Sequence, residues 1–121
     1  MYRALPKATC RGTYPRVQCG MKENLAVLPS TATVRRVTVP ALNWTIENEP
    51  GKKASVAIYA HIASAHSGQL NPTSAQLGLQ LYAEYVDEAR KSPGSHPNID
   101  LLLNVISSGK TAAIVVETDS S

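Results

Sequence analysis

Residues 71–91 read NPTSAQLGLQLYAEYVDEARK and carry the strongest structural pattern in the chain. Asn71 is a favoured N-cap residue and Pro72 is favoured at the first helical position, so a helix is predicted to begin here. Apolar residues recur along one helix face and polar residues occupy the other. The apolar arc holds Ala75, Leu79, Tyr82, Val86 and Ala89. We expect one continuous surface helix with one side buried, in which Gly78 lets another element approach closely.

The other periodic stretches complete a small α+β domain. The predicted segments are strands at 32–39, 42–48 and 111–118 and helices at 22–28, 52–66 and 98–107. The last strand is apolar on both faces, which indicates that it is central in its sheet or covered on both sides. After the short first helix, the chain order is two strands, three helices and one strand. The sequence therefore predicts a two-layer α+β fold, in which a three-stranded, mostly antiparallel sheet packs with about three helices.

The first 20 residues differ in composition from the rest of the chain. They contain four of the 12 lysines and arginines, no acidic residue and both cysteines, Cys10 and Cys19. The rest of the chain carries the other 8 basic residues against 9 acidic ones, so the basic pI does not describe the domain. We predict a disordered basic leader over 1–20, which is a start-site artefact if translation begins at Met21. A single domain over 21–118 and a polar tail at 119–121 follow.

Other interpretations of the leader fit its residues less well. A secretory signal needs an apolar core of about 7–15 residues, and proline, arginine and glycine interrupt this segment throughout. A mitochondrial presequence is poor in acidic residues, as this segment is, but Pro6, Gly12 and Pro15 oppose an amphipathic helix. Two thiols without a nearby histidine are too few for a structural zinc site. Because a cysteine-free domain suits a reducing compartment, we predict a cytoplasmic protein.

Several classes of function are disfavoured by composition and spacing. No apolar run reaches the roughly 20 residues of a membrane-spanning helix. A domain charge near −1 and few aromatic residues disfavour nucleic-acid binding. The domain has no Gly-x-Ser-x-Gly elbow and no cysteine, so a nucleophilic triad is not expected. His61 and His66 are five residues apart and fall on different helix faces, so neither a metal site nor a cofactor is predicted.

Residues 50–55, PGKKAS, join the second strand to the helix that follows. Free N–H groups, the positive end of the helix dipole and two lysines together suit an anion. The candidate ligand-binding residues are Gly51, Lys52, Lys53 and Ser55. The stretch is not a Walker A loop, because Ile46 stands where that pattern needs a glycine. A solvated helix start, with Gly51 serving the turn, explains the same residues.

A second candidate site follows the long helix, in the loop SPGSHP at residues 92–97. Asp100 lies four residues after His96, and a carboxylate bonded to one imidazole nitrogen would leave the other free for proton transfer. Capping of the next helix by His96 or Asn98 is the simpler interpretation. Glu84 and Glu88 share a helix ridge that suits a cation or an acid–base pair, although solvation is commoner. The weak catalytic candidates are His96, Asp100 and Glu84.

Four short stretches of the domain carry a resemblance to a known family. They are NLAVLPS at 24–30, IENEPGK at 46–52, LYAE at 81–84 and PGSHPNID at 93–100. They resemble a small bacterial family known only as a domain of unknown function, over about residues 22–117. The resemblance implies a cytosolic bacterial protein. It brings no activity, cofactor or catalytic residue with it.

Two function hypotheses remain open, because a fold by itself does not identify a function. The first and preferred one is a non-enzymatic binding or regulatory module that engages a protein partner or self-associates. The second is a small enzyme or anion-ligand-binding protein that uses the Gly51-Lys52-Lys53 helix start and the His96–Asp100 loop. A concave pocket that holds His96 and Asp100 beside Lys52 or Glu84 would favour the second.

Overall fold

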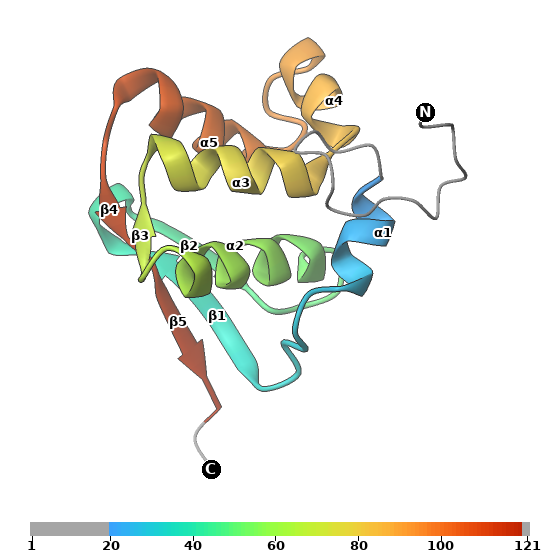
Figure 1. Cartoon of the computed structure of the whole chain (residues 1–121), viewed down its shortest axis with the longest axis vertical. Coiled ribbons are helices and arrows are strands. Elements are labelled where there is room, and N and C mark those ends of the chain that lie inside the picture. Colours follow the sequence, from blue (N-terminus) through green and yellow to red (C-terminus); the bar gives the residue numbers. More distant parts are fainter. Residues whose placement is uncertain (1–19, 120–121) are drawn as a thin grey trace, which may run out of the picture.

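A three-stranded antiparallel sheet of order β2-β1-β5 packs against the helices in the computed structural model, which describes residues 20–119 (Figure 1). The elements in chain order are α1 Met21–Ala26, β1 Val34–Val39, the 3₁₀ turn η2 Pro40–Leu42, β2 Trp44–Glu47, α2 Lys53–Ala65, β3 Gln69–Leu70, α3 Pro72–Tyr82, α4 Tyr85–Lys91, α5 Pro97–Ser108, β4 Ala112–Ala113 and β5 Val115–Thr118. The predicted α+β class and rough chain order are confirmed. The predictions for the leader, with Cys10 and Cys19, lie outside the described residues.

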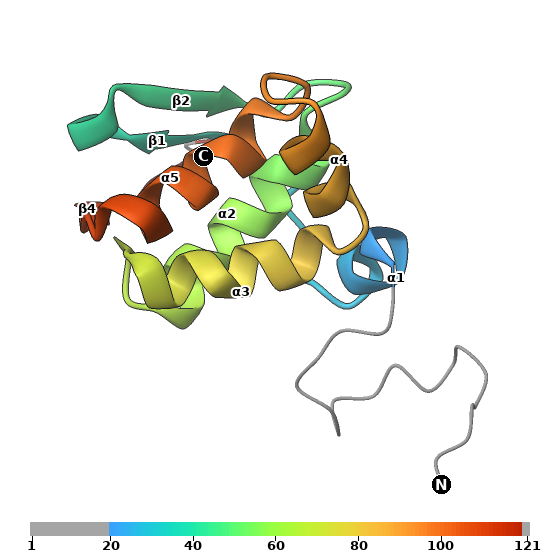
Figure 2. The same ribbon diagram turned by 90° about the horizontal axis from the view of Figure 1, so that it is seen from above.

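Strand β1 is the centre of the sheet. Its buried valines, among them Val37 and Val39, face the helices, which Figure 2 shows gathered on one side of the β1–β2 hairpin. The outward side chains are polar and ion-paired: Arg36 contacts Glu47 at 3.1 Å on β2 and Glu117 at 2.8 Å on β5. Polar residues and valines alternate from Arg36 to Val39 and thus separate the core face from the open face, whereas the register shifts between Val34 and Arg36.

The last strand differs from its prediction. It is broken at Ile114 into β4, which pairs with β3, and β5, which is an edge strand of the main sheet. Val115 on β5 is 43% exposed, so this strand is neither central nor covered on both sides. Its continuous apolar run arises because Ala112 and Ile114 turn into the core while Val115 lies on the open face. The partner strand β3 is two residues long, too short to show a period in the sequence.

The core lies between α2, α3 and α5, and Gly78 determines how closely these helices pack. A Cβ atom at Gly78 would stand 2.6 Å from Leu102 Cδ1 on α5 and 2.8 Å from Ile62 Cδ1 on α2. Such distances leave no room for a side chain unless the neighbours move. The predicted close approach at this glycine is therefore confirmed.

The long helix predicted over 71–91 is wrong in its middle, where the chain breaks into α3 and α4. Ala83 has φ 54° and ψ −118°, a conformation that residues with a Cβ rarely adopt. The break frees carbonyl groups at the end of α3, and Asn24 of α1 satisfies two of them, at 3.3 Å from Gln80 O and 3.2 Å from Leu81 O. Tertiary hydrogen bonds from a distant segment thus outweigh the local preference for one helix.

Candidate functional site

A pocket of about 240 Å³ lies where α2 and α5 begin and α3 ends. Figure 2 shows these helix starts close together, beside the loop that follows α4. The lining residues are Gly51, Lys52, Ser55, Tyr82, Ser95, His96, Pro97, Asn98 and Ile99. We call this the helix-start pocket. It brings together most of the predicted Gly51–Ser55 site and His96, which are about 40 residues apart in the sequence.

Two hydroxyl groups form a short hydrogen bond in this pocket. Ser55 Oγ lies 2.6 Å from Tyr82 OH, and either oxygen can be the donor. Tyr82 is 4% exposed, and this burial raises the pKa of its phenol, an effect that the hydrogen bond from Ser55 partly offsets. Because the charged form is disfavoured in a buried position, Tyr82 stays protonated and acts as a hydrogen-bond donor.

Both helices that begin at the pocket lack a side-chain cap. Lys52 is the N-cap residue of α2 and His96 that of α5, and within residues 20–119 neither makes a side-chain cap hydrogen bond. The first N–H groups of a helix have no partner inside the helix, and its N-terminus carries about half a positive charge. At α5 this supply is smaller than at α2, because Pro97 has no N–H group and Ile99 N donates to His96 O at 3.0 Å. Two such ends therefore face a shared space.

Lys52 and Lys53 are neighbours in the sequence but have different surroundings. Lys52 lines the pocket, and its Nζ lies 3.6 Å from Glu49 Oε2 in an ion pair whose side chains are half exposed. Lys53 Nζ instead donates to Asn48 Oδ1 at 3.1 Å. Of the two lysines predicted as ligand-binding residues, the structure therefore places Lys52 in the pocket wall.

His96 has a different carboxylate partner from the one suggested by its spacing. Its Nε2 lies 2.9 Å from Glu88 Oε1 on α4, and its ring meets Tyr85 edge-on at a centroid distance of 5.6 Å. Asp100 accepts from the backbone N–H of Gly94 at 2.9 Å and thereby closes the loop before α5. The pocket thus contains His96 but is not lined by Asp100.

Glu84 and Asn98 also take up structural roles. Glu84 accepts from the backbone N–H of Met21 at 2.9 Å, so it connects α1 to the break between α3 and α4. Asn98 Oδ1 accepts from Trp44 Nε1 at 2.8 Å and its backbone oxygen from Tyr59 OH at 2.6 Å. The predicted side-chain capping of the third helix by His96 or Asn98 is therefore wrong, because Asn98 is turned toward β2 and α2.

Tyr82 is a pocket residue that sequence reasoning did not select as a candidate site residue. Tyr82 was placed on the buried arc of a long helix, which is correct for its ring. A signal was present, because a buried tyrosine usually finds a partner for its hydroxyl group. Nothing in the sequence indicates which partner, since Ser55 lies 27 residues away.

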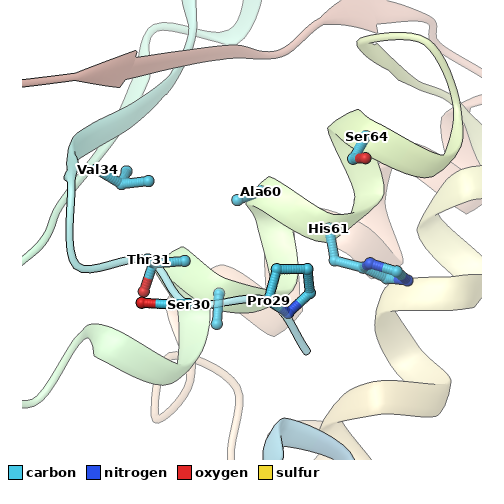
Figure 3. Close-up of a pocket in the computed structure, with 8 residues that line it drawn as sticks. Pro29, Ser30, Thr31, Val34, Ala60, His61 and Ser64 are labelled. Carbon is cyan, nitrogen blue, oxygen red and sulfur yellow. The ribbon is translucent and has the colours of Figure 1, made fainter. Parts of the chain in front are cut away.

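A second pocket, of about 150 Å³, lies between α2 and the loop before β1. Figure 3 shows Thr31 and Val34 on one side of it and Ala60 and Ser64 of α2 on the other. His61 also lines this space. The lining is mainly apolar, in contrast to the donor-rich helix-start pocket.

Two further properties concern metals and membranes. Over residues 20–119, no group of three or more His, Cys, Asp or Glu side chains is arranged to hold a metal ion. None of the helices described is both long and apolar enough to cross a membrane.

The comparison with known families matches residues 21–116 to a family described as an uncharacterized protein conserved in bacteria, DUF2322. The chain belongs to this family. The resemblance expected from the four short stretches is thereby confirmed, with nearly the expected bounds. No curated protein and no solved structure matches the chain.

Proposed function

We propose that this domain is a non-enzymatic binding module that holds a small anionic ligand in the helix-start pocket. The observation that carries the proposal is the convergence of two uncapped helix starts, Lys52 and a hydroxyl pair on one concavity. None of the described residues that line it is an aspartate or glutamate. The wall combines apolar surface with hydrogen-bond donors and the ammonium group of Lys52.

The charge balance around the pocket supports an anion. Each helix start contributes about half a positive charge and adds to the ammonium group of Lys52. The nearby carboxylates are already bonded, Glu49 to Lys52 at 3.6 Å and Glu88 to His96 at 2.9 Å. Both glutamates are more than half exposed, at 51% and 61%, so water and salt screen their charge, as they also screen the charge of Lys52.

The hydrogen bonds inside the pocket support binding rather than catalysis. The partner of Ser55 is a phenol that burial keeps protonated, and a protonated phenol does not accept the proton of a nucleophile. His96 is bonded to Glu88 rather than to Ser55. A protein partner, self-association and a cytoplasmic location remain predictions of the sequence.

The test uses the full chain and two probe anions, phosphate and acetate. Each is titrated while the backbone amide resonances are followed by NMR. We expect the amides of residues 51–55 and 95–99 to shift together along one saturable curve. Lys52→Ala should weaken binding roughly five-fold, because an exposed ammonium group contributes about 1 kcal/mol.

The matched control is Lys53→Ala, which removes the same charge one residue away from a side chain turned toward Asn48. It should leave the affinity within about a factor of two, since exposed charges at longer range are screened. Equal losses in both variants would indicate general electrostatic attraction. Shifts confined to other parts of the domain would contradict the proposed site.

A further inference from the structure

The Ser55–Tyr82 pair has one hydroxyl hydrogen that the hydrogen bond between the two residues does not use. Two hydroxyl groups carry two hydrogens, and the bond of 2.6 Å between the oxygens engages one of them. No other hydrogen bond among residues 20–119 involves either hydroxyl group. One O–H hydrogen therefore remains to be donated, and which oxygen carries it depends on the direction of the shared bond.

The position of this hydrogen restricts where its acceptor lies. Tyr82 is 4% exposed, and both residues line the helix-start pocket. A buried donor without an acceptor is unfavourable, so the pocket favours a ligand with an acceptor atom at this point. The donor is also strengthened, because a hydroxyl group that accepts a hydrogen bond is polarised and becomes a better donor.

We propose that the Ser55–Tyr82 pair determines the ligand class of the pocket by donating its one free hydrogen to an oxygen of a carboxylate or phosphate group on a small molecule. The inference rests on the proposed function, because the two helix starts and Lys52 supply the charge complement. A charged oxygen gains more from such a donor than a neutral one does. The pair is thus a partly buried hydrogen-bond donor in the wall of the helix-start pocket.

A shared donor makes a specific prediction for single and double variants. In Ser55→Ala the phenol of Tyr82 keeps one hydrogen, and in Tyr82→Phe the hydroxyl group of Ser55 keeps one. Each single variant can still donate to the ligand, although without the polarising partner. Only the double variant has lost every hydroxyl hydrogen of the pair, so the effects should be strongly non-additive.

The experiment titrates the full chain with acetate, phosphate and acetamide, the last being a neutral amide of the same size as acetate. We expect each single variant to bind acetate within about three-fold of the unmodified chain. The double variant should lose about ten-fold or more, as for a donor to a charged group. Ser64→Ala, on the same helix but in the second pocket, is the matched control and should bind as the unmodified chain does.

The outcomes separate the two proposals. A double variant that binds acetate normally, or single variants that each lose as much as the double, would overturn the role of the pair and leave the anion site intact. Acetamide that binds as tightly as acetate, or no binding of either anion, would overturn the anion site and the inference with it. Comparison of acetate with phosphate then identifies which oxyanion the pocket prefers.

A second measurement keeps the inference testable if the double variant does not fold. The ring Cζ resonance of Tyr82 in the unmodified chain reports on hydrogen bonding by its phenol. We expect it to shift on saturation with acetate and to stay in place with acetamide. A resonance that ignores acetate while the amides of 51–55 respond would contradict the inference.

Discussion

Helices α2 and α3 both have a serine as their third residue, and the two serines do opposite things. At α3, Ser74 N donates to Asn71 Oδ1 at 2.9 Å while Asn71 N donates to Ser74 Oγ at 2.9 Å, which forms a complete capping box. At α2, Ser55 is turned away from its own helix start toward Tyr82. A capped start fulfils its hydrogen bonds locally and is structural, whereas an uncapped start leaves its N–H groups available to a ligand.

The largest expected effect in this comparison is on stability, from Ser74→Ala. Ser74 is fully buried and also donates to Gln69 O at 2.8 Å, so its removal leaves buried partners unsatisfied. We expect a loss of about 2–3 kcal/mol in the free energy of unfolding. Denaturant unfolding followed by circular dichroism measures it.

The same substitution at α2 is the control. Ser55→Ala should cost less than about 1 kcal/mol, because Tyr82 can donate to water or ligand in the pocket instead. Similar stability losses at both serines would break the distinction between the two helix starts. Anion binding should be unchanged in Ser74→Ala, provided that this variant is studied below its unfolding transition.

The next largest effect is the loss of stability at high pH, to which Tyr82, the partner of Ser55, contributes. Burial raises the pKa of both Tyr82 and Tyr59, so the folded state keeps two phenols protonated that ionise in the unfolded state above pH of about 10. The stability that they contribute is therefore complete below pH of about 10 and is lost as the pH rises further. Above this pH, each tyrosine should lower the free energy of unfolding by about 1.4 kcal/mol per pH unit.

Tyr82→Phe tests this assignment without removing the ring. Urea unfolding between pH 9 and 11.5 should show a shallower decline in stability for the variant, because one of the two buried phenols no longer contributes to it. The phenol of Tyr59 donates to Asn98 O. Tyr59→Phe should reduce the slope of stability against pH by a similar amount. An unchanged slope in Tyr82→Phe would show that its phenol ionises in the folded protein.

The smallest expected effect is a gain, at the other end of α3. Ala83 holds φ 54° and ψ −118° at the turn that directly follows Tyr82, and a residue with a Cβ in such a sparsely populated region costs about 1–3 kcal/mol. Ala83→Gly relieves this strain but adds freedom to the unfolded chain, so we expect a net stabilisation of about 0.5–1 kcal/mol. Thermal unfolding measures the gain, and a loss of stability would indicate that the Ala83 methyl group contributes to packing.

Local signals in the sequence predicted the start of α3 but not its end. Asn71 and Pro72 act within one turn of the helix, and the structure confirms both. At the break before Ala83 the carbonyl groups of Gln80 and Leu81 are bonded by the side chain of Asn24, nearly 60 residues away. No pattern within the helix reports such a contact, so the apolar period alone predicts a helix that continues to Lys91.

The candidate site was predicted in part for the same reason. Helix-start chemistry is local, so Gly51, Lys52 and Ser55 were found from the order of their residues. The pairing of His96 was not, because Glu88 reaches it only after α4 has turned away from α3. Asp100 has the right spacing for His96 but accepts from the N–H of Gly94 instead, because the loop before α5 brings that N–H group to its carboxylate.

The sequence by itself determined the family, the α+β class, the capped start of α3 and the close approach at Gly78, because each depends on residues near one another in the chain or on the total pattern of apolar positions. Only the tertiary structure decided that the starts of α2 and α5 share one pocket and that Ser55 meets Tyr82. The physical reason is that hydrogen bonds between distant segments depend on how the helices pack, and Gly78 and the turn at Ala83 determine that packing.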